Sequence, residues 1–338
     1  MSDNPPPTHA AIMAKLSAKL DTLADVIPPG SKIIYLDYPV HFNVGDMLIN
    51  CGTEAFFQRM RYRVLARLSL FDLCHLDWSN TRAITLKPQI RKFIQALDPK
   101  AILVLHGGGN FGDLYGEFQA MREQVTLAFP DRRIVMLPQS LHFEDKAAQK
   151  RSLDILTSHR DIHLYFRDRE SVSAIREVSP QHGALLPDMA HALWNEPGYS
   201  GAAQTASGSL ALKRTDRETR GTDAGFTAHR TLDWTNLITA WDFLQFRLVR
   251  KSMYASFDRS LRIPAWYWYK LRDRVVKRAQ SLFSRYEIIM TDRLHGLILA
   301  SLLSKRTLFQ DNAYGKLSRY VNTWLSDSPL IGRVNRDR

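Results

Sequence analysis

Arginine and histidine side chains stand where strands of a parallel sheet would present them to a ligand. Near the C-terminus, the TDRLHG motif follows a short apolar run and carries Arg293 and His295 two residues apart. In the first half, FRDRES places Arg167 directly after another apolar run. An arginine at a strand end can grip a carboxylate or phosphate through paired hydrogen bonds. A histidine can carry a proton near neutral pH. These residues predict a site for a phosphorylated, carboxylated substrate.

A run of three glycines is the second candidate. Gly107, Gly108 and Gly109 follow the most apolar strand and precede Asn110. Glycines let the backbone approach a ligand, and N–H groups at the start of the following helix attract anions. The run is neither G-x-G-x-x-G nor a P-loop with its lysine, so it predicts no dinucleotide or nucleoside triphosphate site. A tight strand-to-helix turn without a ligand is the alternative.

Two further turns carry polar side chains. In the NVGD motif, which begins at Asn43, Asp46 either caps the following helix or contacts a sugar hydroxyl at the cleft. The LPQSLH motif forms the turn after another strand and supplies Gln139, Ser140 and His142. Both turns are expected beside the arginines, because an open α/β sheet binds ligands at the carboxyl ends of its strands.

The patterns of other common sites are missing from the sequence. It contains no H-E-x-x-H motif and no G-x-S-x-G elbow, and its eleven histidines are scattered. Cys51 and Cys74 cannot form a disulfide framework or a four-thiolate metal site, and we interpret them as buried thiols in a reducing cytosol. We therefore expect neither a metal nor a cofactor.

The elements that must position these motifs alternate along the chain. Apolar runs of strand length alternate with amphipathic stretches of helical length, which is typical of βαβ units around a parallel sheet. Strands are predicted at 32–35, 101–105, 133–137, 163–166 and 184–186, and helices at 10–24, 46–60, 88–97, 117–129, 144–158 and 169–178. A second series has strands at 209–213, 287–291 and 306–310 and helices at 294–303 and 314–325.

The length and one irregular stretch predict two domains. A chain of 338 residues favours two domains at roughly 100–200 residues each. Residues 196–209 contain Gly, Ser and Thr, interrupt the alternation and are predicted to be the linker. We expect α/β domains at 1–195 and 210–338 that face each other across a cleft.

The net charge of +12 is concentrated in one segment. Residues 245–285 carry eleven basic residues against two acidic ones, interleaved with Phe246, Phe257, Trp266, Tyr267, Trp268 and Tyr269. A basic-aromatic helical surface suits an anionic membrane; the alternative is a solvated face whose aromatic rings pack into the core. No stretch approaches the roughly 20 apolar residues of a membrane span, and the N-terminus lacks a secretory signal. A cytoplasmic protein, peripheral at the inner face of the membrane, is expected, with no nucleic acid partner.

Taken in order, the motifs resemble the polysaccharide pyruvyl transferase family. The resemblance runs from about Ile33 to Trp324 and rests on NVGDMLINCGTEAFF, ILVLHGGGNFGDLY, LPQSLHF, FRDRES, LPD, LKRTDRE and TDRLHGLILASLL. It implies a GT-B-like fold of two Rossmann-like domains. It also implies transfer of pyruvate from phosphoenolpyruvate to a sugar of an exopolysaccharide repeat unit, which forms a cyclic ketal and releases phosphate.

The resemblance places Arg167, Arg293 and His295 in the phosphoenolpyruvate site. From the chemistry of ketal formation we expect His295 to be the general acid and the arginines to hold carboxylate and phosphate. The glycine run with Asn110 would contact the acceptor or the donor's anion. The base is left open between His142 and Asp46.

The implied partners are phosphoenolpyruvate, a lipid-linked oligosaccharide or polysaccharide acceptor, and an anionic membrane surface. Two other functions stay open: a GT-B glycosyltransferase with a nucleotide-sugar donor, and a non-enzymatic scaffold at a membrane surface.

Overall fold

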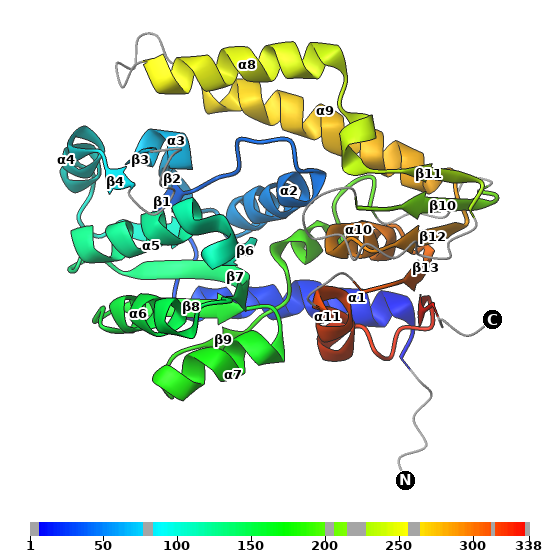
Figure 1. Cartoon of the computed structure of the whole chain (residues 1–338), viewed down its shortest axis with the longest axis horizontal. Helices are drawn as coiled ribbons and strands as arrows, with labels where there is room; N and C mark the ends of the chain where they lie inside the picture. The colour runs from blue at the N-terminus through cyan, green and yellow to red at the C-terminus, as the bar shows by residue number, and fades with distance from the viewer. Residues whose placement is uncertain are drawn as a thin grey trace.

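Two parallel β-sheets with surrounding helices form the structure (Figure 1). The computed structural model describes residues 7–76, 84–199, 206–214, 228–255, 264–311 and 315–334. Within these residues the first sheet consists, in spatial order, of β2 (Arg63–Leu68), β1 (Lys32–Leu36), β5 (Ile102–Leu105), β7 (Ile134–His142), β8 (Ile162–Phe166) and β9 (Ala184–Leu185), with β6 (Gly108–Gly112) paired to β7. The second consists of β11 (Arg230–Leu232), β10 (Ser209–Leu212), β12 (Ile288–Thr291), β13 (Arg306–Phe309) and β14 (Ile331–Arg333).

The helices occupy the connections between these strands. They are α1 (His9–Lys19), α2 (Val44–Arg59), α3 (Leu70–Leu73), α4 (Pro88–Ala96), α5 (Gly116–Ala128), α6 (Lys146–Thr157), α7 (Arg169–Val178), α8 (Ala240–Ala255), α9 (Ala265–Ser284), α10 (Leu294–Leu302) and α11 (Lys316–Trp324). Short 3₁₀ helices are η1 (Leu20–Asp25), η2 (Asp113–Tyr115), η3 (Met189–Leu193) and η4 (Trp234–Leu237), and β3 (Cys74–His75) pairs antiparallel with β4 (Thr85–Leu86). The predicted α/β class with parallel sheets is confirmed.

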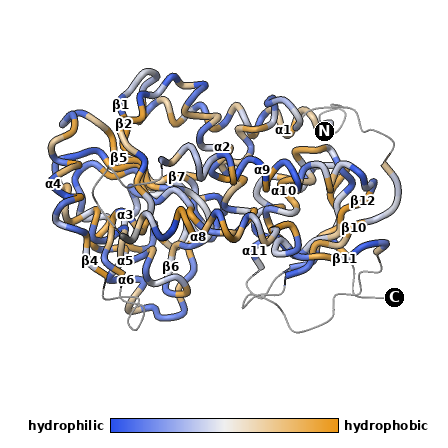
Figure 2. The backbone as a smooth tube through the Cα atoms, turned by 90° about the horizontal axis from the view of Figure 1, so that it is seen from above, coloured by the Kyte–Doolittle hydropathy of each residue, from blue (hydrophilic) through white to orange (hydrophobic). Residues whose placement is uncertain are grey.

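The central strands β1 and β5 of the first sheet are buried on both faces, because they consist almost wholly of apolar residues. In β1, Ile33 and Tyr35 belong to one core cluster, whereas Ile34 and Leu36 belong to the other. Helices α4 to α7 cover the second cluster, and α1 and α2 cover the first. In Figure 2 strands such as β5 and β10 are correspondingly coloured as hydrophobic. Continuous apolar runs of strand length are typical of parallel strands covered on both sides.

The core next to α2 joins the two halves of the chain. It contains apolar side chains of β1 and α2 together with those of β10, α9 and α10. At the N-terminus, His9 of α1 bonds the hydroxyl of Ser328 and the carbonyl of Ser301, each at 2.8 Å. Helix α1 therefore lies against the second half. The domain limits 1–195 and 210–338 stay a prediction, and residues 200–205 of the expected linker lie outside the described residues.

The glycine run differs most from its prediction. It was expected to form a strand-to-helix turn, but Gly108–Gly112 form strand β6, parallel to β7. A Cβ added at Gly107 would lie 2.8 Å from the carbonyl oxygen of Pro138, and one at Gly112 only 1.6 Å from that of His142. The glycines thus allow two backbones to approach closely, which the sequence pattern cannot distinguish from an approach to a ligand.

Two more local predictions are wrong. Strand β7 continues through His142, so Gln139, Ser140 and His142 belong to a strand rather than to a turn. Helix α2 is capped by Asn43, whose side-chain oxygen accepts a bond from Gly45 N at 3.0 Å, and Asp46 lies within the first turn. Strands β2, β6, β11 and β14 and the β3–β4 pair were not predicted.

Segment 245–285 forms much of the helix pair α8 and α9, and most of its described aromatic rings face inward. Trp268 is buried and donates from Nε1 to Pro39 O at 2.7 Å. Tyr269 donates to Glu54 at 2.7 Å. Most of the described rings therefore pack into the core, whereas Trp266 is 55% exposed; Phe257 lies outside the described residues. Among the described helices, none combines the length and apolarity that a membrane span requires.

Two fully enclosed histidines link elements of the core. His106 Nδ1 lies 2.5 Å from the Tyr35 hydroxyl, and His191 Nε2 lies 2.8 Å from the Tyr320 hydroxyl. Burial lowers the pKa of His106 to about 3 and that of His191 to about 4. Both rings are therefore neutral in the folded protein at neutral pH.

We expect the His191→Gln variant to lose stability less steeply than the wild type as the pH falls from about 6.5 to about 4. An unfolded histidine gains its proton near pH 6.5, whereas folded His191 gains it only near 4. The unfolded state thus binds more protons, and stability falls by up to about 1.4 kcal/mol per pH unit for this histidine. Burial raises the pKa of Asp37 to about 7, so protonation of Asp37 in the folded state increases stability as the pH falls. This contribution is the same in the wild type and in the variant, and it does not affect their difference.

Urea denaturation between about pH 7 and 4 measures this difference in slope. The exposed His75, changed to Gln, is the control and should leave the slope unchanged. Equal slopes for the wild type and His191→Gln would contradict the prediction.

Candidate functional site

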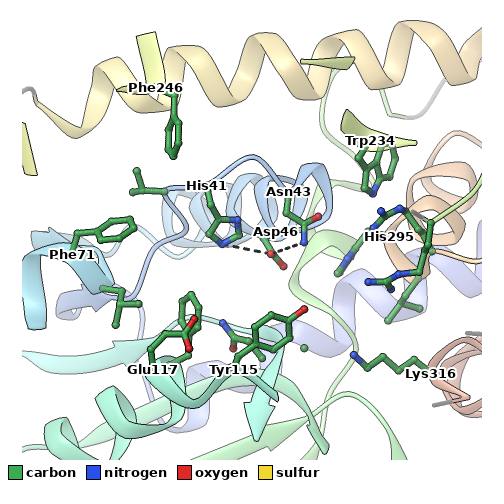
Figure 3. A pocket seen from close by; sticks show the side chains of 18 of the residues that line it. His41, Asn43, Asp46, Phe71, Tyr115, Glu117, Trp234, Phe246, His295 and Lys316 are labelled. Carbon is green, nitrogen blue, oxygen red and sulfur yellow. Dashed lines mark hydrogen bonds and ion pairs between the residues drawn. The ribbon is translucent and has the colours of Figure 1, made fainter. Parts of the chain in front are cut away.

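A cavity of about 380 Å³ lies at the carboxyl ends of strands from both sheets (Figure 3). Arg167 follows β8, Arg293 follows β12, and Arg214 lies just after β10. The cavity is lined by Val40, His41, Asn43, Asp46, Leu70, Phe71, Gly109, Asn110, Tyr115, Glu117, Phe118, Arg167, Arg214, Trp234, Phe246, Arg250, Arg293, Leu294, His295 and Lys316. The volume is within the range of small-molecule sites.

The structure brings together the residues expected to bind the substrate's anionic groups. Of the predicted site residues, the cavity is lined by Asn43, Asp46, Gly109, Asn110, Arg167, Arg293 and His295. The predicted residues Gly107, Gly108, Gln139, Ser140 and His142 are not among its lining residues. Gln139 and Ser140 instead hydrogen-bond to residues that line the cavity: Gln139 donates to Asn110 Oδ1, and the Ser140 hydroxyl accepts from Arg167.

Arg167, His295 and Asp188 form one buried cluster. Arg167 is 2% exposed, donates from Nη1 to Asp188 Oδ2 at 2.6 Å and from Nε to the Ser140 hydroxyl at 2.8 Å. His295 Nε2 lies 3.2 Å from the same Asp188 oxygen and 3.3 Å from Arg167 Nη1. One carboxylate oxygen thus holds a guanidinium from the first half and an imidazole from the second.

Asp188 is fully buried and remains ionised. Burial by itself would raise the pKa of its carboxyl, but attraction to His295 and Arg167, together with hydrogen bonds, outweighs burial and holds the pKa well below its usual range. Its other oxygen accepts from Ala190 N at 2.9 Å, and its own N–H donates to the Tyr320 hydroxyl at 3.1 Å. Sequence reasoning missed Asp188 as a site residue; its place in the LPD motif was the available signal.

Arg293 has a carboxylate partner of its own. Its Nε and Nη2 donate to the two oxygens of Asp233 at 2.6 and 2.7 Å, in the paired geometry that fixes a guanidinium plane. Asp233 is buried and also caps η4 through Trp234 N at 2.6 Å. Asp233 was missed as well, because nothing in its local sequence marks it as a partner of an arginine sixty residues away.

Glycines at two positions give the key side chains room. A Cβ added at Gly45, in the first turn of α2, would lie 2.5 Å from Nδ1 of His295. A Cβ added at Gly109 would lie 2.7 Å from Nη2 of Arg167. The imidazole therefore packs directly on the α2 backbone, and the guanidinium reaches the cavity beneath β6.

Further cavity residues were not predicted. They include His41, Arg214, Arg250 and Lys316, and in total Arg and Lys number five among the lining residues and Asp and Glu two. His41 Nε2 lies 3.6 Å from Asp46 Oδ2, which also accepts from Asn43 Nδ2 at 2.9 Å (Figure 3). The excess of positive charge suits a small anion with more than one negative charge.

The cavity offers no site typical of a metal ion. Across the described ranges, His, Cys, Asp and Glu side chains do not gather in groups of three or more that could hold a metal. The arrangement is suited to anion binding by the fixed arginines and to proton transfer by the histidine beside them.

Comparison with known proteins gives a family match over most of the chain. The family model described as polysaccharide pyruvyl transferase matches residues 43–312. The chain is 36% identical over 319 residues to EpsO of Bacillus subtilis, by its name a candidate pyruvyl transferase, covering 94% of this chain and 92% of that protein. It is 26% identical over 308 residues to pyruvyl transferase 1 of Schizosaccharomyces pombe, covering 89% of this chain and 71% of that protein.

A solved structure shows a similar fold. The crystal structure of an uncharacterised protein from Klebsiella pneumoniae has a TM-score of 0.59 at 17% identity, covering 95% of this chain and 98% of that chain. The similarity extends over both sheets.

Replacing Asp188 by Asn should strongly destabilise the fold. It removes the charge that Arg167 and His295 share, and loss of one partner of a buried ion pair costs about 3–5 kcal/mol. Urea denaturation measures the change in the free energy of unfolding. The matched control is Asp161→Asn, whose partly exposed pair with Arg133 should contribute less than about 1 kcal/mol. Similar small losses in both variants would contradict the assignment.

Proposed function

Because the chain belongs to the polysaccharide pyruvyl transferase family, we propose that it transfers pyruvate from phosphoenolpyruvate to a sugar of an exopolysaccharide repeat unit. Two sugar hydroxyls become the oxygens of a cyclic ketal, and inorganic phosphate is released. The observation that carries the proposal is the convergence of Arg167 and His295 on one buried carboxylate at the edge of a positively charged cavity, beside Arg293.

In this proposal the arginines hold the donor. Arg167 is fixed by Asp188 and Ser140, and Arg293 by Asp233, so both guanidinium groups are oriented before the substrate binds. A preorganised cation needs no rearrangement as negative charge moves onto the leaving phosphate. The carboxylate and the phosphate of phosphoenolpyruvate would each face one of these groups.

His295 then supplies the proton. It protonates the methylene carbon of phosphoenolpyruvate, which becomes the methyl group, and positive charge develops at the central carbon. A sugar hydroxyl attacks that carbon, and the second hydroxyl then replaces phosphate and closes the ring. Each hydroxyl loses its proton: one proton restores His295, and the other leaves with the phosphate. Asp188 and Arg167 fix the orientation of the imidazole ring.

The acceptor would bind on the other side of the cavity. His142 is not among the lining residues, so of the two bases considered from the sequence, we assign the role to Asp46. Asp46 is positioned by Asn43 and lies beside His41. Aromatic side chains of Tyr115 and Trp234 line the same cavity and can pack on the apolar face of a sugar.

The proposal includes the architecture and the place of action. The two sheets would form GT-B-like, Rossmann-like domains, with the cavity between them. The acceptor would be a lipid-linked oligosaccharide, and the protein would act in the cytoplasm at the inner face of the membrane.

Phosphorus NMR tests the reaction directly. With phosphoenolpyruvate and a repeat-unit acceptor, we expect inorganic phosphate to appear only when the acceptor is present. Release of a nucleoside diphosphate from a nucleotide-sugar, with phosphoenolpyruvate untouched, would support a glycosyltransferase instead. No turnover of either donor would favour the non-enzymatic scaffold.

The His295→Gln variant should lose most of this turnover. Removing a general acid lowers the rate by about 10²–10⁴-fold, while the amide keeps polar contacts to Asp188. Phosphate release measures the rate, and circular dichroism checks the fold. The exposed His75→Gln variant is the matched control. Turnover within about twofold of the wild type would remove His295 from the mechanism.

The Gly45→Ala variant tests the position of the ring. The added methyl group would lie 2.5 Å from His295 Nδ1, so the imidazole must move while every cavity side chain is kept. We expect a reduction in kcat of about tenfold or more, because small displacements of catalytic groups reduce rates steeply. Gly332→Ala on β14, whose added Cβ would meet only the end of the Leu308 side chain at 3.2 Å, controls for the glycine change. Unchanged kcat in Gly45→Ala would contradict this geometry.

A further inference from the structure

The exposed apolar side chains of this protein gather on one helix pair. Of the large hydrophobic residues that are about half exposed or more in the described part of the chain, all but Leu127 belong to α8 or to the first turn of α9. Trp241, Leu244 and Leu248 are 60%, 48% and 51% exposed, and Trp266 is 55% exposed. In Figure 1 this pair lies along one edge of the molecule, outside both sheets.

Three of these residues share one face of α8. The spacing of Trp241, Leu244 and Leu248 places them on a single stripe of the helix, which we call the α8 outer stripe. Val249 and Met253 of the same helix are buried, as is Asp242. Helix α8 therefore carries apolar side chains both where it packs on the protein and where it faces outward.

Exposed basic residues accompany the stripe. Arg247 and Lys251 are exposed on α8 next to it, and Lys270 Nζ lies 4.7 Å above the ring of Trp266. In 240–255 and 264–285, the acidic residues are Asp242, which is buried against Arg278, and Asp273, which pairs with Arg272 beside Cys51. The surface around the stripe is thus positive, and its partner should be anionic.

We propose that the α8 outer stripe, with Trp266 and the flanking basic residues, docks this protein onto an anionic membrane surface. Tryptophan and leucine on one face with Lys and Arg beside them are the features of helices that lie in the headgroup region of a bilayer. A second copy of the chain fits less well, because a twofold pairing through α8 would bring its basic residues together without acidic partners.

The docked helix would also form part of the cavity wall. Phe246 and Arg250, on the inner side of α8, line the cavity, and Figure 3 shows Phe246 pointing into it from this helix. Docking through the outer stripe would therefore hold the cavity next to the lipid headgroups, where a lipid-linked sugar is displayed. This last link rests on the proposed function, whereas membrane binding itself does not.

Vesicle cosedimentation tests the docking surface. The probes are phosphatidylcholine vesicles with and without about one third phosphatidylglycerol. We expect the wild type to bind only the anionic vesicles, and the Trp241→Ser/Leu244→Ser/Leu248→Ser variant to bind at least about tenfold more weakly. Leu127→Ser, which removes an equally exposed leucine on α5, is the matched control and should bind as the wild type does.

Charge reversal tests the electrostatic part. Arg247→Glu/Lys251→Glu should weaken binding to anionic vesicles by about tenfold or more, whereas Lys150→Glu on α6, which is 71% exposed, should not. Light scattering monitors the oligomeric state of every variant. Three results would overturn the proposal. The first is that the wild type does not bind anionic vesicles, and the second is that the stripe variant binds them as tightly as the wild type. The third is that the wild type is a dimer and the stripe variant is a monomer.

Activity separates this inference from the proposed function. With a water-soluble acceptor and phosphoenolpyruvate, the stripe variant should release phosphate at the wild-type rate, since none of its changed residues lines the cavity. With a lipid-linked acceptor in anionic vesicles, its rate should fall with its membrane binding. Absence of turnover in every protein would count against the proposed function alone, because vesicle binding is measured independently.

Discussion

The buried charge of Asp188 is the constraint on which the arrangement of the cavity depends. A carboxylate without solvent must be matched by cations and hydrogen-bond donors, or it would be strongly destabilising. Here the partners of the carboxylate include Arg167 at the end of β8 and His295 at the start of α10. The backbone N–H of Asp188 in turn donates to the Tyr320 hydroxyl of α11. The two halves of the protein are therefore fixed relative to each other at the point where the proposed chemistry takes place.

The second arginine repeats the same principle within the second half of the chain. Arg293 is held by both oxygens of Asp233, which also caps η4, so a helix terminus and a guanidinium are positioned by one side chain. Two arginines with fixed planes form a site whose order comes from the protein rather than from the ligand. Because each guanidinium is already paired with a carboxylate, it binds the substrate less tightly than a free cation would. In return, the guanidinium does not have to reorient during the reaction.

Close backbone packing provides the space that these polar contacts need. Gly45 lets His295 rest on α2, and Gly109 lets Arg167 pass beneath β6, while Gly107 and Gly112 let β6 lie against β7. Within this short motif, glycines thus allow both the close packing of β6 on β7 and the approach of Arg167 to the cavity. Behind the cavity, Gln139 and Arg122 both donate to Asn110 Oδ1 and so fix the side chain of this lining residue.

The sequence by itself determined the parallel α/β class and the places of most strands and helices, which follow from local hydrophobic periodicity. Arg167 and Arg293 follow strands of different sheets, so their shared cavity was expected from the resemblance to the family and not from the rule that the strand ends of one sheet share an edge. The sequence could not identify Asp188 and Asp233 as partners of arginines 21 and 60 residues away, or Lys316 as a cavity residue, because these contacts depend on how distant segments pack. It also misassigned the glycine run, since close approach to a neighbouring strand and close approach to a ligand require the same residue. Only the tertiary structure decided which aromatic rings of α8 and α9 are buried and which remain exposed, because burial depends on which helix face meets the rest of the protein.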